Sequence, residues 1–129
     1  MGHIHHDLQY HVVFSTKNRH PYLTPEKILL IQSTAAELAA NLRFTILALN
    51  GYVDHLHILL QIPPRLSVAM VIKRIKGRTS REIGELYWQV GYWVTVVEAK
   101  NLKSIEEYIN RQWQAHENRL VLAADFFEP

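Results

Sequence analysis

Two histidines, two positions apart in an apolar stretch, are the residues of this sequence best suited to chemistry. His55 and His57 lie in a segment that follows Asn50-Gly51 and ends at Pro63-Pro64. Side chains alternate across an extended strand, so both imidazoles project from the same face. At that separation both rings can reach one divalent metal ion. The alternative is a pair of histidines that only make hydrogen bonds, and the motif alone does not distinguish the two.

A second group of polar residues falls on a predicted helix near the end of the sequence. Ser104 is suited to cap this helix, which we expect over residues 105–116. Gln112 and His116 project into its apolar stripe and Tyr108 sits at the edge of that stripe, a conflict that tends to mark functional sites. Tyr108 and Gln112 are four apart, so they could approach one metal ion together, with Gln112 as an oxygen ligand. Without a metal, Gln112 and His116 would be a buried hydrogen-bonding pair and Tyr108 an ordinary interface aromatic.

Basic residues gather in one span that contains no acidic residue. Six of the fourteen lysines and arginines lie in it, namely Arg65, Lys73, Arg74, Lys76, Arg78 and Arg81. The cluster predicts contact with nucleic-acid phosphates, because opposite charges intersperse on ordinary surfaces; a solvated helix face is the alternative. Lys17 and Arg19 lie in a loop that either touches a phosphate backbone or is a polar connection. The aromatic turn 87–92 either stacks on unpaired bases or packs at a strand end.

Alternation and helical spacing predict the order strand, helix, strand, strand, helix, strand, helix. Strands are expected at residues 8–15, 44–49, 52–62 and 93–97, one helix at 25–42 after the cap Thr24, and another from the cap Ser67 to Gly77, which ends or bends it. Asn50-Gly51 predicts a tight turn between antiparallel neighbours. This is the split βαβ pattern of ferredoxin-like α+β folds, a four-stranded antiparallel sheet with two helices on one face, here with an additional C-terminal helix.

The aliphatic side chains of the histidine strand point away from the two imidazoles and must face the core: Leu56, Ile58, Leu60 and Ile62. The first two helices are crossover connections and belong on that aliphatic side. The last helix is then free to lie against the face that carries His55 and His57.

The composition is typical of a soluble globular protein. With 129 residues, 48% hydrophobic and 20% charged, we expect a single domain over residues 1–129, with residues 1–7 as a poorly ordered leader whose His3, His5 and His6 are incidental. The absence of cysteine removes disulfides and thiolate ligands, so a metal would need nitrogen and oxygen ligands. No apolar run could span a bilayer and no signal peptide is visible, which predicts a cytoplasmic protein without a membrane partner.

The pairing of His55-Leu56-His57 with the downstream segment Tyr108-Ile109-Asn110-Arg111-Gln112 resembles the single-tyrosine HUH transposases of small bacterial insertion sequences, the IS200-like transposases. Three further segments are similar in the same order. Residues 10–19 resemble the opening strand and loop of the family, residues 67–80 its second helix, and residues 88–92 its aromatic turn. The resemblance covers nearly the whole chain, from Tyr10 to Asn118.

The resemblance implies an enzyme that nicks single-stranded DNA, recognises DNA hairpins and rejoins strands. Tyr108 would be the nucleophile and form a 5′-phosphotyrosine link that stores the phosphodiester bond, so strands could be rejoined without ATP. His55, His57 and Gln112 would hold Mg²⁺ or Mn²⁺, a Lewis acid at the scissile phosphate. The protein would be a homodimer without a nucleotide cofactor, and the sequence has no glycine-rich nucleotide-binding loop. No role follows for His116.

Three other functions stay open. A host-adapted relative would use the same chemistry on dispersed repeat hairpins. A catalytically silent nucleic-acid-binding module of the RNA-recognition type fits the sheet topology, but it leaves the paired histidines, Tyr108 and Gln112 unexplained. A metal-dependent phosphodiesterase in which water attacks would leave Tyr108 without a task. The single tyrosine on the last helix argues against replication initiators that use two.

Overall fold

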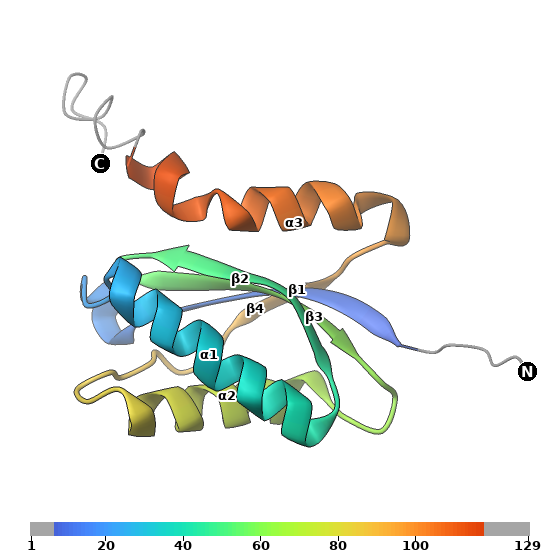
Figure 1. Ribbon diagram of the computed structural model, residues 1–129, viewed down its shortest axis with the longest axis horizontal. Coiled ribbons are helices and arrows are strands. Elements are labelled where there is room, and N and C mark those ends of the chain that lie inside the picture. Colours follow the sequence, from blue (N-terminus) through green and yellow to red (C-terminus); the bar gives the residue numbers. More distant parts are fainter. Residues whose placement is uncertain (1–6, 118–129) are drawn as a thin grey trace, which may run out of the picture.

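The computed structural model describes residues 7–117 as a four-stranded antiparallel sheet between two layers of helices (Figure 1). The sheet has the order β2-β3-β1-β4, which confirms the predicted ferredoxin-like α+β fold. The predicted leader lies outside the described residues, apart from Asp7. The elements are β1 (Leu8–Ser15), η1 (Lys17–Arg19), α1 (Pro25–Leu42), β2 (Thr45–Tyr52), β3 (His55–Ile62), α2 (Val68–Glu82), β4 (Trp93–Val96), η2 (Ala99–Asn101) and α3 (Leu102–Asn110).

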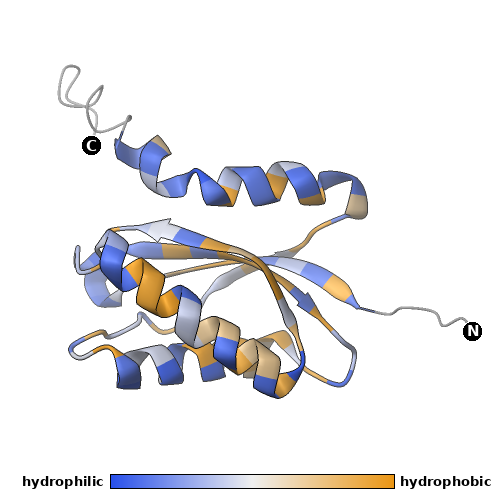
Figure 2. Cartoon of the chain, viewed as in Figure 1, coloured by the Kyte–Doolittle hydropathy of each residue, from blue (hydrophilic) through white to orange (hydrophobic). Residues whose placement is uncertain are grey.

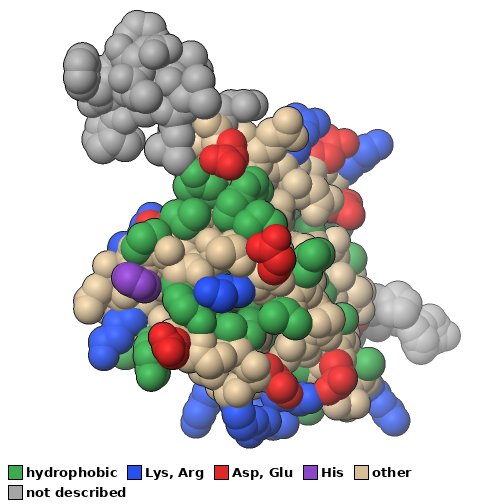
Figure 3. Space-filling view, turned by 60° about the vertical axis from the view of Figure 1, so that its left-hand side comes forward, with side chains coloured by type: hydrophobic (Ala, Val, Ile, Leu, Met, Phe, Trp, Pro, Cys, Tyr) green, Lys and Arg blue, Asp and Glu red, His purple; other side chains and the backbone are tan. Residues whose placement is uncertain are grey.

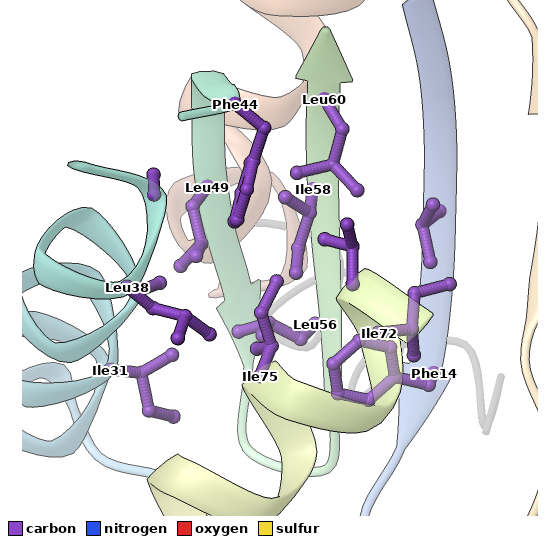
Figure 4. Close-up of a cluster of buried hydrophobic side chains, with 14 of the residues drawn as sticks. Phe14, Ile31, Leu38, Phe44, Leu49, Leu56, Ile58, Leu60, Ile72 and Ile75 are labelled. Atoms are coloured by element: carbon purple, nitrogen blue, oxygen red, sulfur yellow. The ribbon is translucent and has the colours of Figure 1, made fainter. Parts of the chain in front are cut away.

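The two faces of the sheet are covered as the alternation in β3 predicts. The main core lies between the sheet and the helices α1 and α2, and it includes Leu56, Ile58 and Leu60 of β3 (Figure 4). On the other face α3 covers a smaller cluster of buried residues, Ala48, Leu59, Val97 and Ile109. Figure 2 shows α3 as mainly hydrophilic, with apolar residues at intervals. None of the helices described in residues 7–117 is long and apolar enough to cross a membrane.

The first two helices begin at the predicted caps. The hydroxyl of Thr24 accepts a hydrogen bond from the backbone N–H of Lys27, and the hydroxyl of Ser67 accepts one from Met70, both at 3.1 Å. Each bond satisfies one of the amide groups that a helix start leaves without an intrahelical partner. These local bonds explain why the helix starts could be read from the sequence.

The predicted hairpin between β2 and β3 is present, but its turn is not at Asn50-Gly51. Both residues lie within β2, and residues 53–54 form the turn. Gly51 pairs with Leu56, and a Cβ atom added to Gly51 would lie 2.2 Å from the carbonyl oxygen of His55. Glycine is therefore required here by the close approach of two backbones, and not by a left-handed turn.

The predicted end or bend of the second helix at Gly77 is wrong, because α2 continues to Glu82. Ile75 and Thr79, on either side of Gly77, are fully buried. Their packing against the core outweighs the low helix propensity of one glycine.

The last helix begins earlier than predicted and is interrupted. α3 starts at Leu102, so Ser104 lies inside it, and the Ser104 hydroxyl donates to the carbonyl three residues earlier. At Arg111 the backbone leaves helical angles, and helical structure resumes over residues 112–117. The side-chain amide of Asn50 donates to the Asn110 carbonyl at this break, at 3.1 Å. Asn50 thus satisfies a backbone group that the interruption leaves without an intrahelical donor.

Candidate active site

The two motif histidines lie at the start of β3, on the face that α3 covers. Their ring centroids are 5.2 Å apart, and both side chains are buried. Leu59, two positions further along β3, belongs to the small cluster under α3. The predicted common face of His55 and His57 is therefore the face on which the last helix packs.

His55 is held by a carboxylate from the hairpin turn. Asp54 Oδ1 lies 2.9 Å from Nδ1 of His55, and Asp54 Oδ2 accepts a hydrogen bond from Nε of Arg19 at 3.0 Å. Burial works to raise the pKa of Asp54, but the hydrogen bonds from His55 and Arg19 bring that pKa below its usual range. Asp54 is thus ionised and accepts the Nδ1–H of His55. The Nε2 atom of His55 is the ring nitrogen left for a ligand.

His57 is held by a third histidine. Its Nδ1 atom lies 2.9 Å from Nε2 of His11, which is buried on β1. Burial, with the neighbouring histidines, lowers the pKa of His57 to about 3, and burial also lowers the pKa of His11. Both imidazoles are neutral at pH 7, which is the state that a metal ligand requires. The Nε2 atom of His57 is the nitrogen left for a ligand.

α3 and the helical segment that follows it, residues 112–117, bring three side chains to the histidines. Tyr108 is 51% exposed, and its ring centroid lies 5.5 Å from that of His57. Gln112 is only 2% exposed, and its Oε1 atom lies 3.1 Å from Nε2 of His116. The ring of His116 in turn meets that of His55 edge-on, with centroids 4.9 Å apart. The structure thus contains the Gln112–His116 hydrogen bond that the sequence allowed.

An open cavity of about 490 Å³ lies over these residues. It is lined by His55, His57, Tyr108 and His116, by Arg19, and by the loop that precedes β4. The volume falls in the range of sites that hold small ligands. Of the residues predicted for catalysis and metal binding, the tyrosine and both motif histidines line the cavity, whereas Gln112 lies buried beside His116.

The cavity offers two imidazole nitrogens to a metal ion, and further ligands would have to be of another kind. Among residues 7–117, no group of three or more histidine, cysteine, aspartate and glutamate side chains is arranged to hold one. The available donors are Nε2 of His55 and of His57, and a third protein donor would have to be of another kind, such as the amide oxygen of Gln112. Mg²⁺ and Mn²⁺ prefer oxygen ligands, so most of the remaining positions would fall to phosphate or water.

Lys17 and Arg19 lie beside this cavity, in the loop after β1. Asn18 and Arg19 both have positive φ values, 57° and 56°. Arg19 lines the histidine cavity and also a second cavity of about 420 Å³, which Lys17 and Tyr87 help to form. The loop predicted to touch a phosphate backbone therefore adjoins the site.

The basic residues of α2 lie on the opposite side of the sheet. Lys73, Arg74 and Arg81 line a cavity of about 280 Å³ beside α2 together with Arg78, and in the described part of the chain none of the first three forms an ion pair. Arg78 pairs with acidic residues of α1 and α2. Figure 3 shows lysine and arginine side chains gathered along the lower edge of this view of the molecule. The positive charges of Lys73, Arg74 and Arg81 on this surface are thus not neutralised by any described ion pair.

Two of the predicted DNA-binding residues are engaged with backbone carbonyls instead. Arg65 donates to the carbonyls of Leu42 and Arg43, at 3.0 and 2.7 Å. The Lys76 ammonium donates to the carbonyls of Gln89 and Gly91, at 2.9 and 2.6 Å. Lys76 therefore fixes the loop that forms one wall of the histidine cavity.

His11 and Asp54 are the site residues that the sequence interpretation missed. Asp54 precedes the motif directly, but the turn predicted at Asn50-Gly51 put Asp54 inside a strand, whereas it lies in the turn. His11 lies two positions before Val13, on the same face of β1, and Val13 pairs with His57 across the two strands. Once β1 is known to pair with β3 in this register, His11 must lie diagonally from His57 on the same face. The missing information was the strand register, which no local pattern encodes.

The chain is similar to transposases in sequence and in structure. A family model described as "Transposase IS200 like" matches residues 4–112. The transposase of insertion sequence element IS200 from Salmonella typhimurium is 32% identical over 124 residues, which cover 87% of this chain and 81% of that protein. The ISDra2 transposase TnpA of Deinococcus radiodurans is 24% identical over 119 residues, with 83% and 85% covered.

Two solved structures share the fold. The crystal structure of a protein of Deinococcus radiodurans regarded as a transposase has a TM-score of 0.68 and 25% identity, and the match covers 88% of this chain and 95% of that one. The REP-associated tyrosine transposase bound to a REP hairpin has a TM-score of 0.66 and 15% identity, with 86% and 70% covered.

Proposed function

We propose that this chain, which belongs to the family of IS200-like transposases, cuts and rejoins single-stranded DNA through a covalent bond between DNA and Tyr108. The observation that carries the proposal is that Tyr108, His55 and His57 line one cavity, although the tyrosine is about fifty positions away in the sequence. A water-dependent phosphodiesterase or a silent binding module gives no reason for the tyrosine to lie there.

In this proposal Tyr108 attacks the scissile phosphorus. A bond forms between the tyrosine oxygen and phosphorus, and the bond from phosphorus to the 3′ oxygen breaks. The phenolic proton is lost to solvent, and the departing 3′ oxygen takes up a proton. His55, His57 and Gln112 would hold Mg²⁺ or Mn²⁺, which when bound supplies a Lewis acid at the phosphate. Because the 5′-phosphotyrosine retains the bond energy, another 3′-hydroxyl can reverse the step and join strands without ATP.

The arginine and lysine side chains beside the cavity would position the single strand. Arg19 is 63% exposed at its side chain even while it pairs with Asp54, so its charge can reach a phosphate from the cavity edge. Lys17 is exposed in the same loop. A cationic edge of this kind attracts the DNA backbone without reading its sequence.

The α2 surface, formed by Lys73, Arg74, Arg78 and Arg81, is proposed to bind a DNA hairpin. The hairpin in the structure of the REP-associated relative supports this substrate class. Because α2 and α3 cover opposite faces of the sheet, duplex binding and strand cleavage would use different sides of the molecule (Figure 1). Lys76 and Arg65 would contribute mainly through the backbone carbonyls that they hold.

A homodimer is also proposed. β4 is an edge strand, and all four of its residues are exposed, including Trp93, Val94 and Val96. An exposed apolar edge strand offers unpaired backbone groups for pairing with another chain. A second copy of this chain is the partner that the proposal names.

The test is a covalent adduct assay with single-stranded oligonucleotides from the ends of the protein's own locus, in the presence of Mn²⁺. The unmodified protein is expected to give a denaturation-resistant protein–DNA adduct, and Tyr108→Phe to give none. Tyr87→Phe is the matched control, since Tyr87 is also exposed but does not line the histidine cavity. Binding without any adduct would favour a silent module. Cleavage that survives Tyr108→Phe would identify water as the nucleophile.

A further inference from the structure

We propose that His11 is a positioning residue for His57: its Nε2 atom accepts the Nδ1–H of His57 and thereby leaves the Nε2 lone pair of His57 for a metal ion. The inference rests on the proposed function, because it concerns a ligand of the proposed metal site. It assigns a task to a buried histidine that the catalytic scheme does not otherwise use.

His11 and His57 have the geometry of a direct hydrogen bond between ring nitrogens. The two nitrogen atoms are 2.9 Å apart, the ring planes are inclined by 28° with their centroids 5.1 Å apart, and both side chains are buried. His11 is itself confined by the ring of Trp93, which meets it edge-on with centroids 5.2 Å apart. A buried polar contact between two confined rings fixes the orientation of both.

The direction of this hydrogen bond decides what His57 can do. A neutral imidazole has one N–H and one lone pair. If His57 donates from Nδ1, the lone pair at Nε2 is free for a metal ion. If His11 donates instead, Nε2 of His57 must carry the hydrogen and cannot coordinate. Only the first direction is compatible with a metal at the cavity.

Both motif histidines then donate a hydrogen bond from Nδ1, but to different partners. Asp54 accepts the Nδ1–H of His55 at 2.9 Å, and His11 accepts the Nδ1–H of His57 at 2.9 Å. A partner on the second ring nitrogen fixes the tautomer and orientation of a metal-binding histidine. The partner of His55 is a carboxylate, whereas the partner of His57 is a second imidazole.

The first test reads the tautomer directly in the metal-free protein. With ¹⁵N-labelled histidine, long-range ¹H–¹⁵N NMR correlations distinguish Nδ1–H from Nε2–H for each ring at pH 7.5. We expect His57 in the Nδ1–H form. An Nε2–H form of His57 would overturn the inference, whatever the activity of the protein. This measurement decides the question even where a substituted protein fails to fold.

The second test measures Mn²⁺ binding by calorimetry without DNA. His11→Phe keeps a ring but removes the acceptor, and it is expected to weaken Mn²⁺ binding about 10–100-fold. His11→Gln places an amide oxygen near the former Nε2 and is expected to restore binding to within a few-fold. Equal affinity of the unmodified protein and a folded His11→Phe would overturn the inference. Absence of Mn²⁺ binding by an unmodified protein with the Nδ1–H tautomer would instead refute the metal in the proposed function.

Discussion

Replacing Gly51 by alanine is expected to destabilise the hairpin that carries the motif histidines. Gly51 lies in β2 opposite Leu56, and an added Cβ would be 2.2 Å from the carbonyl oxygen of His55 and 3.1 Å from Cα of Leu56. Both distances are shorter than the about 3.5 Å at which non-bonded heavy atoms attract each other. The obstructing atoms belong to the backbone, so no side-chain rotation can relieve the clash.

The loss of folding stability expected for Gly51→Ala can be given in kcal/mol. Forcing extra atoms into a packed region costs about 1–3 kcal/mol, and the upper half of this range applies because two paired strands must separate. For a domain of this size each kcal/mol changes the melting temperature by roughly 4 °C, so Gly51→Ala should lower it by roughly 8–12 °C. Gly77→Ala is the matched control. Outside the neighbouring backbone of α2 itself, no atom lies within 4 Å of a Cβ at Gly77, so alanine there should stabilise by about 0.5–1 kcal/mol.

Thermal and urea unfolding followed by circular dichroism would measure both substitutions. Gly51→Ala should also weaken Mn²⁺ binding, because the strand separation displaces His55, whereas Gly77→Ala should leave Mn²⁺ affinity unchanged. A Gly51→Ala protein as stable as the unmodified one would refute the close approach of β2 and β3 at this position. The turn at residues 53–54 would then have to be reconsidered.

Three further predictions concern the site and its DNA surface. Asp54→Asn, which weakens the acceptor for His55, should lower Mn²⁺ affinity about 10–100-fold in calorimetry, and an unchanged affinity would contradict the role of Asp54. The metal-free protein should become less stable to urea as the pH falls from 6.5 toward 3. The pKa of His57 is about 3 in the folded protein and near 6.5 in the unfolded chain, so the unfolded chain binds the proton first. His57→Phe should make the stability less dependent on pH. Lys73→Gln should reduce the salt slope of hairpin binding by about 1 in fluorescence anisotropy, and Lys103→Gln on α3 should not.

Features encoded by neighbouring residues were predictable from the sequence. The caps Thr24 and Ser67 and the bounds of α1 follow from short-range hydrogen bonding and helical spacing. The two faces of β3 follow from strict alternation, which also placed α3 on the histidine side. Each of these properties depends on residues within a few positions of one another, and a periodic pattern therefore reports them.

Features that depend on pairing between distant segments were not predictable. The sequence suggested a turn at Gly51. The structure shows that glycine is required there by the backbone of the neighbouring strand β3, which no local pattern reveals. Lys76 resembled its basic neighbours, although it holds a loop more than ten residues downstream. His11 showed no motif, because its partner His57 is 46 positions away. In all three cases the decisive contact lies across the sheet or between a helix and a loop.

The histidines of the site lie on the central strands of the sheet, whereas Tyr108 lies on the less firmly packed helix α3. β1 and β3 are the central strands, so His11 and the motif histidines share the most protected elements of the sheet. The main core also lies directly beneath these strands. By contrast α3 is anchored by a small cluster with one buried residue of its own, Ile109, and it is interrupted at Arg111. Local stability follows the amount of buried apolar contact. The proposed metal ligands His55 and His57 are therefore fixed by the fold, whereas the proposed nucleophile Tyr108 lies on the helix that the fold holds least firmly.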